Sequence, residues 1–515
     1  MGVQVSGLSI RSRVLAGSAW TIGGYGFSRT LRLGSHLVLA WLLAPEIFGL
    51  MALVSVFMNA LAMFTDLGLS QSIIQNKRGY DPVFQNTVWT MQVIRGLGIW
   101  LLVCAMAWPY AWWYAQNDPA AWKLLALLPV AGLGPAIGGF VSPALHALKK
   151  DLRLAKFTIL ELIQQLITIA VIIAWALVQP SVWAMVAGSL AGTAAKVVMT
   201  HLLVPGHRLR FQWDRECVTQ VFHFGRWIFL SSAFSFLAVN LDTLLLGRLL
   251  SLSDLGVYNI ARVFAMVALD LVSRLGTTVM FPLYSRYQSD PVRLMTVALK
   301  SRNVLLWSGG ALCISLAVIS PLFFETLWDV RYHDAGMIAQ LLALDMWARI
   351  ILLTMDRVPL ALGNSRALFM ANMIQTAGIV PAGLGYWLAG LPGFIVGLVA
   401  GPLAAHLYLV QGLPAEKRPM VNQSFRASIL VVCLGVFLAG GTTLLRPVLS
   451  HRLWVSLVVL LAVAPVAMAA YVVYKRLLVS GTGRPSTSGA PVTASEVTMN
   501  SHGEIQSLKG VQGRP

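Results

Sequence analysis

Charged residues are scarce in this sequence of 515 residues: they make up 11% of the chain, whereas hydrophobic residues make up 57%. In a soluble domain, charged residues make up about a quarter of all residues, so this composition excludes an ordinary soluble globular protein. Acidic residues are rarer than basic ones, with 20 Asp and Glu against 38 Lys and Arg. The composition therefore predicts a polytopic membrane protein.

Cysteine is also rare. The four cysteines are scattered, and three of them lie within apolar runs: Cys104, Cys217, Cys313 and Cys433. None has the spacing of a metal ligand or of a disulfide framework. We therefore expect neither disulfides nor a metal or other cofactor, although coupling to H⁺ or Na⁺ stays open.

Catalytic motifs are missing as well. The sequence has no Ser/His/Asp arrangement, no HExxH, no glycine loop for phosphate and no acidic DxD pair on a loop. The longest loops on the predicted outer side, around 110–121 and 323–335, are short. The second loop contains four ionisable residues: Glu325, Asp329, His333 and Asp334. Contact of the loop with solvent is enough to explain this cluster. We expect that the protein is not an enzyme.

Long apolar runs are abundant. A helix needs about 20 residues to cross about 30 Å of hydrocarbon, and fourteen runs approach or exceed that length. They cover residues 14–43, 47–73, 84–108, 121–147, 156–178, 182–204, 220–249, 255–283, 296–320, 336–362, 366–390, 393–412, 426–445 and 453–474. Short connections make neighbouring helices antiparallel. The runs predict an all-α polytopic membrane protein with about 14 transmembrane helices.

Basic residues gather on one side of these helices. That side holds Arg11, Arg13, Lys77, Arg78, Lys149, Lys150, Arg153, Arg208, Arg210, Arg215, Arg286, Arg293, Lys300, Arg366, Lys417, Arg418, Lys475 and Arg476, and the other side holds Lys123, Arg248, Arg331, Arg446 and Arg452. Because cytoplasmic loops are rich in Lys and Arg, both termini are predicted to be cytoplasmic. The net charge of +18 then reflects topology and not binding of nucleic acid.

An internal repeat divides the chain. Residues 227–264 align without a gap on residues 20–57, at an offset of 207, with ten identities where about four are expected by chance. Trp20/Trp227 and the turn glycines Gly49/Gly256 are among them. Because the offset spans six predicted helices, we expect two lobes of six helices in a pseudo-twofold arrangement, with a central cleft between them.

The repeat defines the expected parts of the chain. They are a cytoplasmic N-terminus (1–13), a first six-helix lobe (14–210), a second six-helix lobe (211–412), two additional transmembrane helices (413–478) and a cytoplasmic tail (479–515). The tail is rich in Gly, Ser, Thr and Pro, and this composition predicts disorder.

Charged side chains within the apolar runs are the candidate binding groups. Tyr25, Arg29, Arg32 and His36 recur at a spacing that places them on one face of a helix. Charges near the middle of a membrane are costly, so they pair with an acid or face a watery cavity. Two interpretations stay open: Arg29 and Arg32 pair with Asp66, Glu161 or another acid, or they form the wall of an anion-binding cavity.

Other helices add further candidates. Arg95 has no acid within a helical turn, so it is a substrate-binding candidate like Arg29 and Arg32. The remaining substrate-binding candidates are Asp242, Arg262 and Arg349. The i,i+4 spacings of Asp270/Arg274 and Asp345/Arg349 predict pairs that neutralise each other.

The two repeats share their predicted helices, but the positive charge of the first repeat is not conserved in the second. At the offset of 207, Arg29 and Arg32 align with Phe236 and Val239. A cleft with one strongly cationic wall suits a substrate that carries phosphate, because guanidinium groups match phosphate oxygens geometrically.

Four segments resemble a known family. They are RVLAGSAW (13–20), LLAPEIFGLMALVSVF (42–57), DLGLSQSIIQ (66–75) and LDTLLLGRLLSLSDLGVYNIAR (241–262). Over about residues 12–475 the chain is similar to the Wzx-type oligosaccharide flippases, in the polysaccharide transporter branch of the MATE-like (MOP) superfamily.

The resemblance implies two six-helix lobes plus two helices in the bacterial inner membrane. It implies export of an oligosaccharide repeat unit linked to undecaprenyl pyrophosphate, by alternating access, for exopolysaccharide, capsule or O-antigen synthesis. Polysaccharide polymerase and chain-length regulator proteins are then the expected partners.

Two alternatives are open. A cation-coupled multidrug exporter of the same fold is expected to carry acidic residues deep in a lobe, and Asp66 alone gives that reading weak support. A membrane polymerase or ligase acting on the same lipid-linked sugars usually has a large outer loop, which this sequence lacks.

Overall fold

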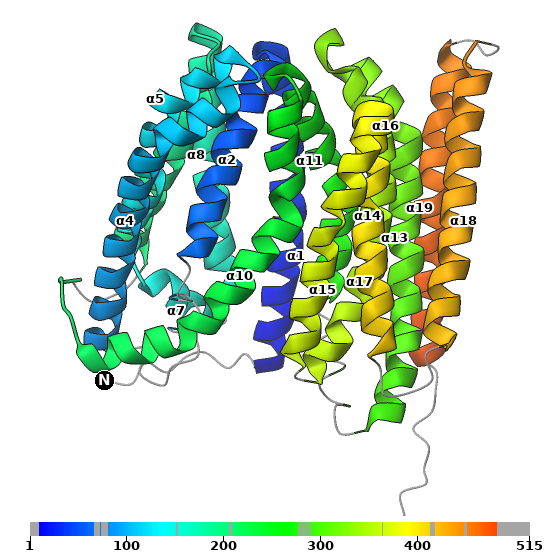
Figure 1. Cartoon of the computed structure of the whole chain (residues 1–515). Coiled ribbons are helices and arrows are strands. Elements are labelled where there is room, and N and C mark those ends of the chain that lie inside the picture. The colour runs from blue at the N-terminus through cyan, green and yellow to red at the C-terminus, as the bar shows by residue number, and fades with distance from the viewer. Residues whose placement is uncertain are drawn as a thin grey trace, which may run out of the picture. The chain divides into compact units, whose positions relative to one another are not determined.

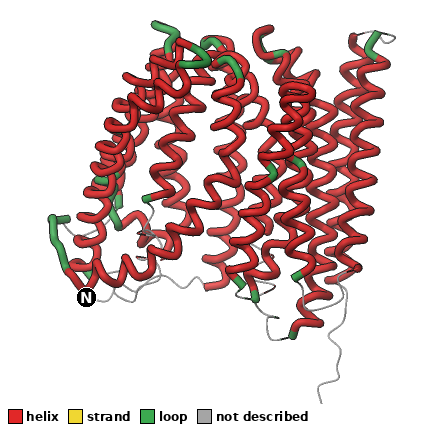
Figure 2. The backbone as a smooth tube through the Cα atoms, viewed as in Figure 1, coloured by secondary structure: helices red, strands yellow, loops and turns green. Residues whose placement is uncertain are grey.

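The structure is a computed structural model that describes residues 10–65, 69, 73, 81–150, 153–204, 209–276, 280, 284, 287, 290–362, 364–412, 418–447 and 451–481. Helices are the regular elements of this described part, as Figure 2 shows. Residues Met1–Ala469 form one compact unit, which contains every described helix up to the first part of the last one. The predicted tail beyond residue 481 lies outside the described residues.

The first lobe contains most of the predicted helices in the predicted order (Figure 1). They are α1 (Ile10–Leu42), α2 (Pro45–Phe64), α4 (Pro82–Ala115), the 3₁₀ turn η1 (Pro119–Lys123), α5 (Leu124–Ala131), α6 (Leu133–Gly138), α7 (Ala144–Lys150), α8 (Leu154–Val178) and α9 (Val182–Leu203). The span predicted at 121–147 is broken into α5, α6 and α7. Glycines and prolines cause the break, and Gly96 of α4 leaves room for the backbone of Pro135 in α6.

The second lobe and the additional helices follow. They are α10 (Arg215–Leu249), α11 (Leu252–Leu275), α13 (Pro291–Leu327), the 3₁₀ turn η3 (Val330–Tyr332), α14 (Asp334–Ala361), α15 (Ser365–Ala377), α16 (Ile379–Leu398), α17 (Ala400–Gln411), α18 (Arg418–Leu445) and α19 (His451–Gly481). Helix α16 contains a turn at Ala389 and Gly390, where Gly390 has a φ of 64°. This turn separates the helices predicted at 366–390 and 393–412.

Local sequence explains where several of these helices begin. Asp81 accepts a hydrogen bond from the backbone N–H of Val83, and Asp214 accepts one from Cys217. Ser251 accepts one from Asp254 in the same way. Such side chains satisfy N–H groups that have no partner within the first turn, so each of these helices starts at a fixed residue.

Ten stretches of the described residues are long and apolar enough to cross a membrane, and a shorter apolar stretch, Leu453–Met468, lies in α19. One of the ten, Arg366–Gln411, covers α15 from its second residue, together with α16 and α17, and contains the turn at Gly390. The prediction of an all-α polytopic membrane protein is therefore confirmed. The number of about fourteen spans stays a prediction.

Helices α2 and α11 cross with their backbones in contact, and the contact is reciprocal. A Cβ atom added at Gly49 would clash with the carbonyl oxygen of Leu252, and one added at Gly256 would clash with that of Pro45. At the offset of 207, Pro45 corresponds to Leu252 and Gly49 to Gly256. Such an exchange of equivalent contacts is what a twofold axis between two repeats produces.

Replacing Gly49 or Gly256 with alanine is expected to lower the midpoint of thermal unfolding by several degrees. The methyl group has no space, and forcing atoms into a packed contact costs about 1–3 kcal/mol. Gly98 of α4 is the matched control, because nothing lies within 4 Å of a Cβ atom at that position. Unchanged unfolding of both crossing variants in detergent would show that the two backbones do not touch.

The crossing is part of a set of contacts that join the lobes at one end, which we call the closed end. This end holds the turns at 43–44, 116–118, 250–251 and 328–329. Tyr332 donates to the carbonyl oxygen of Leu43 at 2.8 Å, and Asn117 donates to that of Leu250 at 2.7 Å. The N–H of Leu252 also bonds to Asp118 at 3.0 Å. The sequence predicts that the closed end faces the outside.

Candidate functional site

The candidate site begins on α1, which belongs to the first lobe and also contacts the second. One side of α1 packs on α8, where Gln165 donates to the carbonyl oxygen of Ser28 at 2.9 Å. On another side, Arg29 forms an ion pair with Asp270 of α11. The ion pair joins the two lobes away from the closed end.

This ion pair agrees with the interpretation in which Arg29 pairs with an acid other than Asp66 or Glu161. Asp66 lies outside the described residues, and Glu161 is exposed. Spacing predicted a pair of Asp270 with Arg274, which stays a prediction, and the structure shows an ion pair of Asp270 with Arg29 of α1. Spacing along α11 identifies residues on one face, but it cannot identify which helix packs against that face.

Arg29 and Arg32 are accessible. The side chains of Arg29 and Asp270 each keep 25% of their surface exposed, and Arg32, three residues further along α1, is exposed. Exposed charges at membrane depth face water and not lipid, because their transfer into hydrocarbon is costly. We call Arg29 and Arg32 the cationic face of α1.

Of the two further candidates on α1, His36 does not extend the cationic face. His36 is partly buried, and its ring lies 6.1 Å from that of Phe48 in α2, centroid to centroid. Its Nδ1 atom has no hydrogen-bond partner among the described residues. The side chain of Tyr25 lies outside the described ones.

Asp242 and Arg262 lie inside the second lobe. Asp242 of α10 is buried, and its Oδ2 atom lies 3.1 Å from Nε of Arg262 on α11. Tyr258 donates to the same oxygen at 2.9 Å, and Arg262 also donates to the carbonyl oxygen of Val239. This network neutralises Asp242 and links α10 to α11.

Arg349 completes a second buried pair. Its Nε atom lies 2.7 Å from Asp345 Oδ2, so the i,i+4 pair predicted on α14 is confirmed. Arg349 also donates to the carbonyl oxygen of Ala238 on α10 at 3.4 Å. Asp242 and Arg349 line a cavity of about 20 Å³, which has room for about one water molecule and not for a phosphate. These charges hold helices together.

Arg95 lines a cavity of the first lobe that neither Arg29 nor Arg32 lines. It donates to the carbonyl oxygen of Ala62 at 2.6 Å and to the hydroxyl of Thr65 at 3.1 Å, at the C-terminal end of α2. A cation there is favourable, because carbonyl groups at a helix C-terminus carry partial negative charge. The cavity, of about 510 Å³, is lined only by first-lobe residues, among them Gln92, Arg95, His146, Gln164, Thr193 and Lys196.

Arg302 has the largest fully buried side chain in the described part of the chain, and the sequence did not identify it as a candidate. Arg302 of α13 donates to Thr354 of α14 at 2.9 Å. On α18 it donates to the carbonyl oxygen of Met420 at 3.0 Å and to the hydroxyl of Ser424 at 2.6 Å. The only signal in the sequence was a single arginine inside the apolar run at 296–320. An arginine at that place resembles a residue at the boundary of a membrane span.

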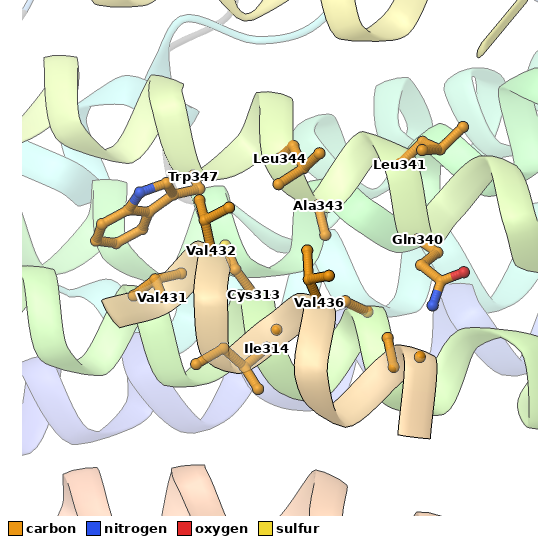
Figure 3. Close-up of a pocket in the computed structure, with 14 residues that line it drawn as sticks. Cys313, Ile314, Gln340, Leu341, Ala343, Leu344, Trp347, Val431, Val432 and Val436 are labelled. Atoms are coloured by element: carbon orange, nitrogen blue, oxygen red, sulfur yellow. The ribbon is translucent and has the colours of Figure 1, made fainter. Parts of the chain in front are cut away.

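An apolar groove lies between α13, α14 and α18 (Figure 3). It has a volume of about 290 Å³, and Cys313, Leu344, Trp347 and Val436 are among the lining residues. Among the residues that line the groove, Gln340 alone has a side-chain amide. The groove therefore does not suit a charged group.

Two acidic residues of the loop at 323–335 pair with nearby arginines. Asp329 Oδ1 lies 2.7 Å from Arg331 Nε, and Glu325 Oε1 lies 2.9 Å from Arg446 Nη1. Hydrogen bonds from the side chain and backbone of Arg331 hold the pKa of Asp329 below its ordinary value. Asp329 stays ionised near neutral pH, as expected for a solvated loop.

The chain is similar to known proteins of polysaccharide biosynthesis. The family model for polysaccharide biosynthesis proteins matches residues 38–335. Lipopolysaccharide biosynthesis protein WzxC of Escherichia coli (strain K12) is 23% identical over 441 residues, which are 84% of this chain and 87% of that protein. Amylovoran biosynthesis protein AmsL of Erwinia amylovora is 22% identical over 319 residues, which are 62% and 81%.

The fold has a counterpart among solved structures. Lipid II flippase MurJ, in an inward closed conformation, superposes with a TM-score of 0.67 over 89% of this chain and 99% of that chain. The sequence identity is 14%, so this likeness concerns the fold alone.

Proposed function

Because this chain belongs to the polysaccharide biosynthesis protein family, we propose that it is a flippase for an oligosaccharide linked to undecaprenyl pyrophosphate in the bacterial inner membrane. The observation that carries the proposal is the cationic face of α1, where Arg29 and Arg32 are accessible beside the second lobe. A pyrophosphate brought to membrane depth loses hydrating water, and two guanidinium groups replace that water with paired hydrogen bonds.

The closed end supports transport by alternating access. Contacts between the lobes close the end that is predicted to face outward. Arg29 and Arg32 lie about 20 and 15 Å from the C-terminal end of α1, at 1.5 Å per residue, so a substrate from the cytoplasm would reach them without passing that end. Release on the other side requires the closed end to open while the cytoplasmic side closes.

The cellular setting follows from the same proposal. Both termini lie in the cytoplasm, and the exported unit passes to a polysaccharide polymerase with its chain-length regulator. Coupling to H⁺ or Na⁺ stays a prediction. The role is transport and not catalysis, because no bond of the substrate changes.

Deletion of the gene in its native host tests the proposal. The expected result is loss of surface polysaccharide together with lipid-linked repeat units that accumulate on the cytoplasmic leaflet. Lipid-linked units are extracted and quantified, and their leaflet is determined with a membrane-impermeant sugar-modifying reagent. Restoration by the wild-type gene is the control.

Two other outcomes of this deletion would contradict the proposal. Normal surface polysaccharide with increased sensitivity to toxic small molecules indicates a multidrug exporter. Repeat units that reach the outer leaflet but stay unpolymerised indicate a polymerase or ligase.

A further inference from the structure

The ion pair between Arg29 and Asp270 is more exposed than the pairs Asp242–Arg262 and Asp345–Arg349. Its two side chains are each 25% exposed, whereas Asp242 and Arg262 are 5% and 12% exposed, and Asp345 and Arg349 are 2% and 12% exposed. The buried pairs lie within the second lobe, while the Arg29 pair joins α1 to α11 across the lobes. A solute that reaches the cationic face of α1 therefore meets this pair first.

The carboxylate of Asp270 presents the same chemistry as the proposed substrate. Carboxylate and phosphate oxygens both bind a guanidinium group through charge-assisted hydrogen bonds, and one edge of the guanidinium cannot serve both. We propose that Asp270 occupies Arg29 while the protein is empty and that the substrate pyrophosphate displaces it. Asp270 is then a specificity-determining residue, since only a strongly anionic group displaces it. This inference rests on the proposed flippase function.

Partial exposure makes the exchange energetically possible. An accessible ion pair is weak, because water and salt screen it, whereas breaking a buried pair leaves an uncompensated charge in the protein. A pyrophosphate carries more negative charge than a carboxylate, so it binds the partly exposed guanidinium of Arg29 more strongly. The displaced carboxylate stays within reach of solvent and lies one helical turn from Arg274.

The exchange also removes a link between the lobes. Arg29 lies on α1 of the first lobe and Asp270 on α11 of the second. When pyrophosphate holds Arg29, this link is broken, and the contacts of the closed end still join the lobes. Binding of the substrate therefore changes the relative stability of the inward-open and outward-open conformations, which is what a ligand must do to drive a conformational change.

Binding of inorganic pyrophosphate to the purified full-length protein tests the exchange. Isothermal titration in detergent compares wild type, Asp270→Asn, Arg29→Ala and the double variant. Asp270→Asn is expected to bind pyrophosphate about tenfold more tightly, because the competing carboxylate is gone. Arg29→Ala is expected to bind it about tenfold more weakly, and the double variant is expected to match Arg29→Ala, because Asp270 acts only through Arg29.

Glu46→Gln is the matched control for charge. Glu46 is an exposed carboxylate paired with Lys123 at 2.9 Å near the closed end, so this variant removes one negative charge far from the cationic face. Its affinity for pyrophosphate is expected to equal that of wild type. Asp270→Ser serves as a second variant, and size-exclusion profiles establish that each protein is folded.

The possible outcomes separate this inference from the proposed function. Wild-type binding that is lost in Arg29→Ala, with no gain in either Asp270 variant, overturns the exchange and leaves the flippase proposal standing. An equal gain in Glu46→Gln also overturns it, since net charge then explains the effect. Absence of any pyrophosphate binding by wild type counts against both.

Discussion

Replacing Arg32 with alanine is expected to reduce polysaccharide export about ten- to hundredfold while the protein stays in the membrane at its normal level. A hydrogen bond to a charged group contributes about 1.5–3 kcal/mol, which corresponds to that range of affinity. The exposed side chain of Arg32 has little packing to lose. Surface polysaccharide and membrane-inserted protein are measured in the same cells.

Arg426 of α18 provides a control for this substitution. It is also an exposed arginine, but it lies outside both lobes, so Arg426→Ala is expected to export normally. Arg32→Lys is expected to recover only part of the export, because an ammonium group cannot make paired hydrogen bonds to phosphate. If Arg32→Ala removes the protein from the membrane, Arg32 is a structural residue and the binding role is wrong.

Replacing Arg302 with alanine is expected to lower the free energy of unfolding by about 3–5 kcal/mol and to deplete the protein from the membrane. Arg302 is 1% exposed and connects α13 to α14 and α18. Its removal leaves a cavity and takes away the donor that the hydroxyl of Thr354 accepts from. Thermal unfolding in detergent measures the effect.

Lys300→Ala is the matched control for Arg302. Lys300 is a cation on the same helix, two residues away, and it is exposed. Its replacement is expected to leave the unfolding temperature unchanged. If Arg302→Ala unfolds at the wild-type temperature, the hydrogen bonds to α18 do not contribute to stability and this account of Arg302 is wrong.

The backbone arrangement followed from the sequence because it depends on periodic, local properties. Apolar length predicted most of the helices, and the offset of 207 predicted that Gly49 and Gly256 are equivalent. Their reciprocal contact agrees with that prediction. The span at 121–147 was predicted less well, because prolines and glycines within one apolar run divided it into α5, α6 and α7.

Partners of charged residues were harder to predict, because they depend on which helices meet. The pair of Asp345 and Arg349 lies within one helix, and its spacing was sufficient. The pair of Arg29 and Asp270 joins two lobes, and no local pattern links these residues. Arg302 binds groups on two other helices, so a single arginine in an apolar run gave little indication of its role.

Movement of a labelled substrate across liposomes tests the central claim most directly. The purified protein is reconstituted with a fluorescent undecaprenyl-pyrophosphate-linked oligosaccharide, and a membrane-impermeant quencher reports the label in the outer leaflet, with and without an imposed H⁺ or Na⁺ gradient. Wild type is expected to expose inner-leaflet label to the quencher, whereas the Arg29→Ala/Arg32→Ala variant is expected to behave like protein-free liposomes. Equal movement by wild type and this variant would contradict the account.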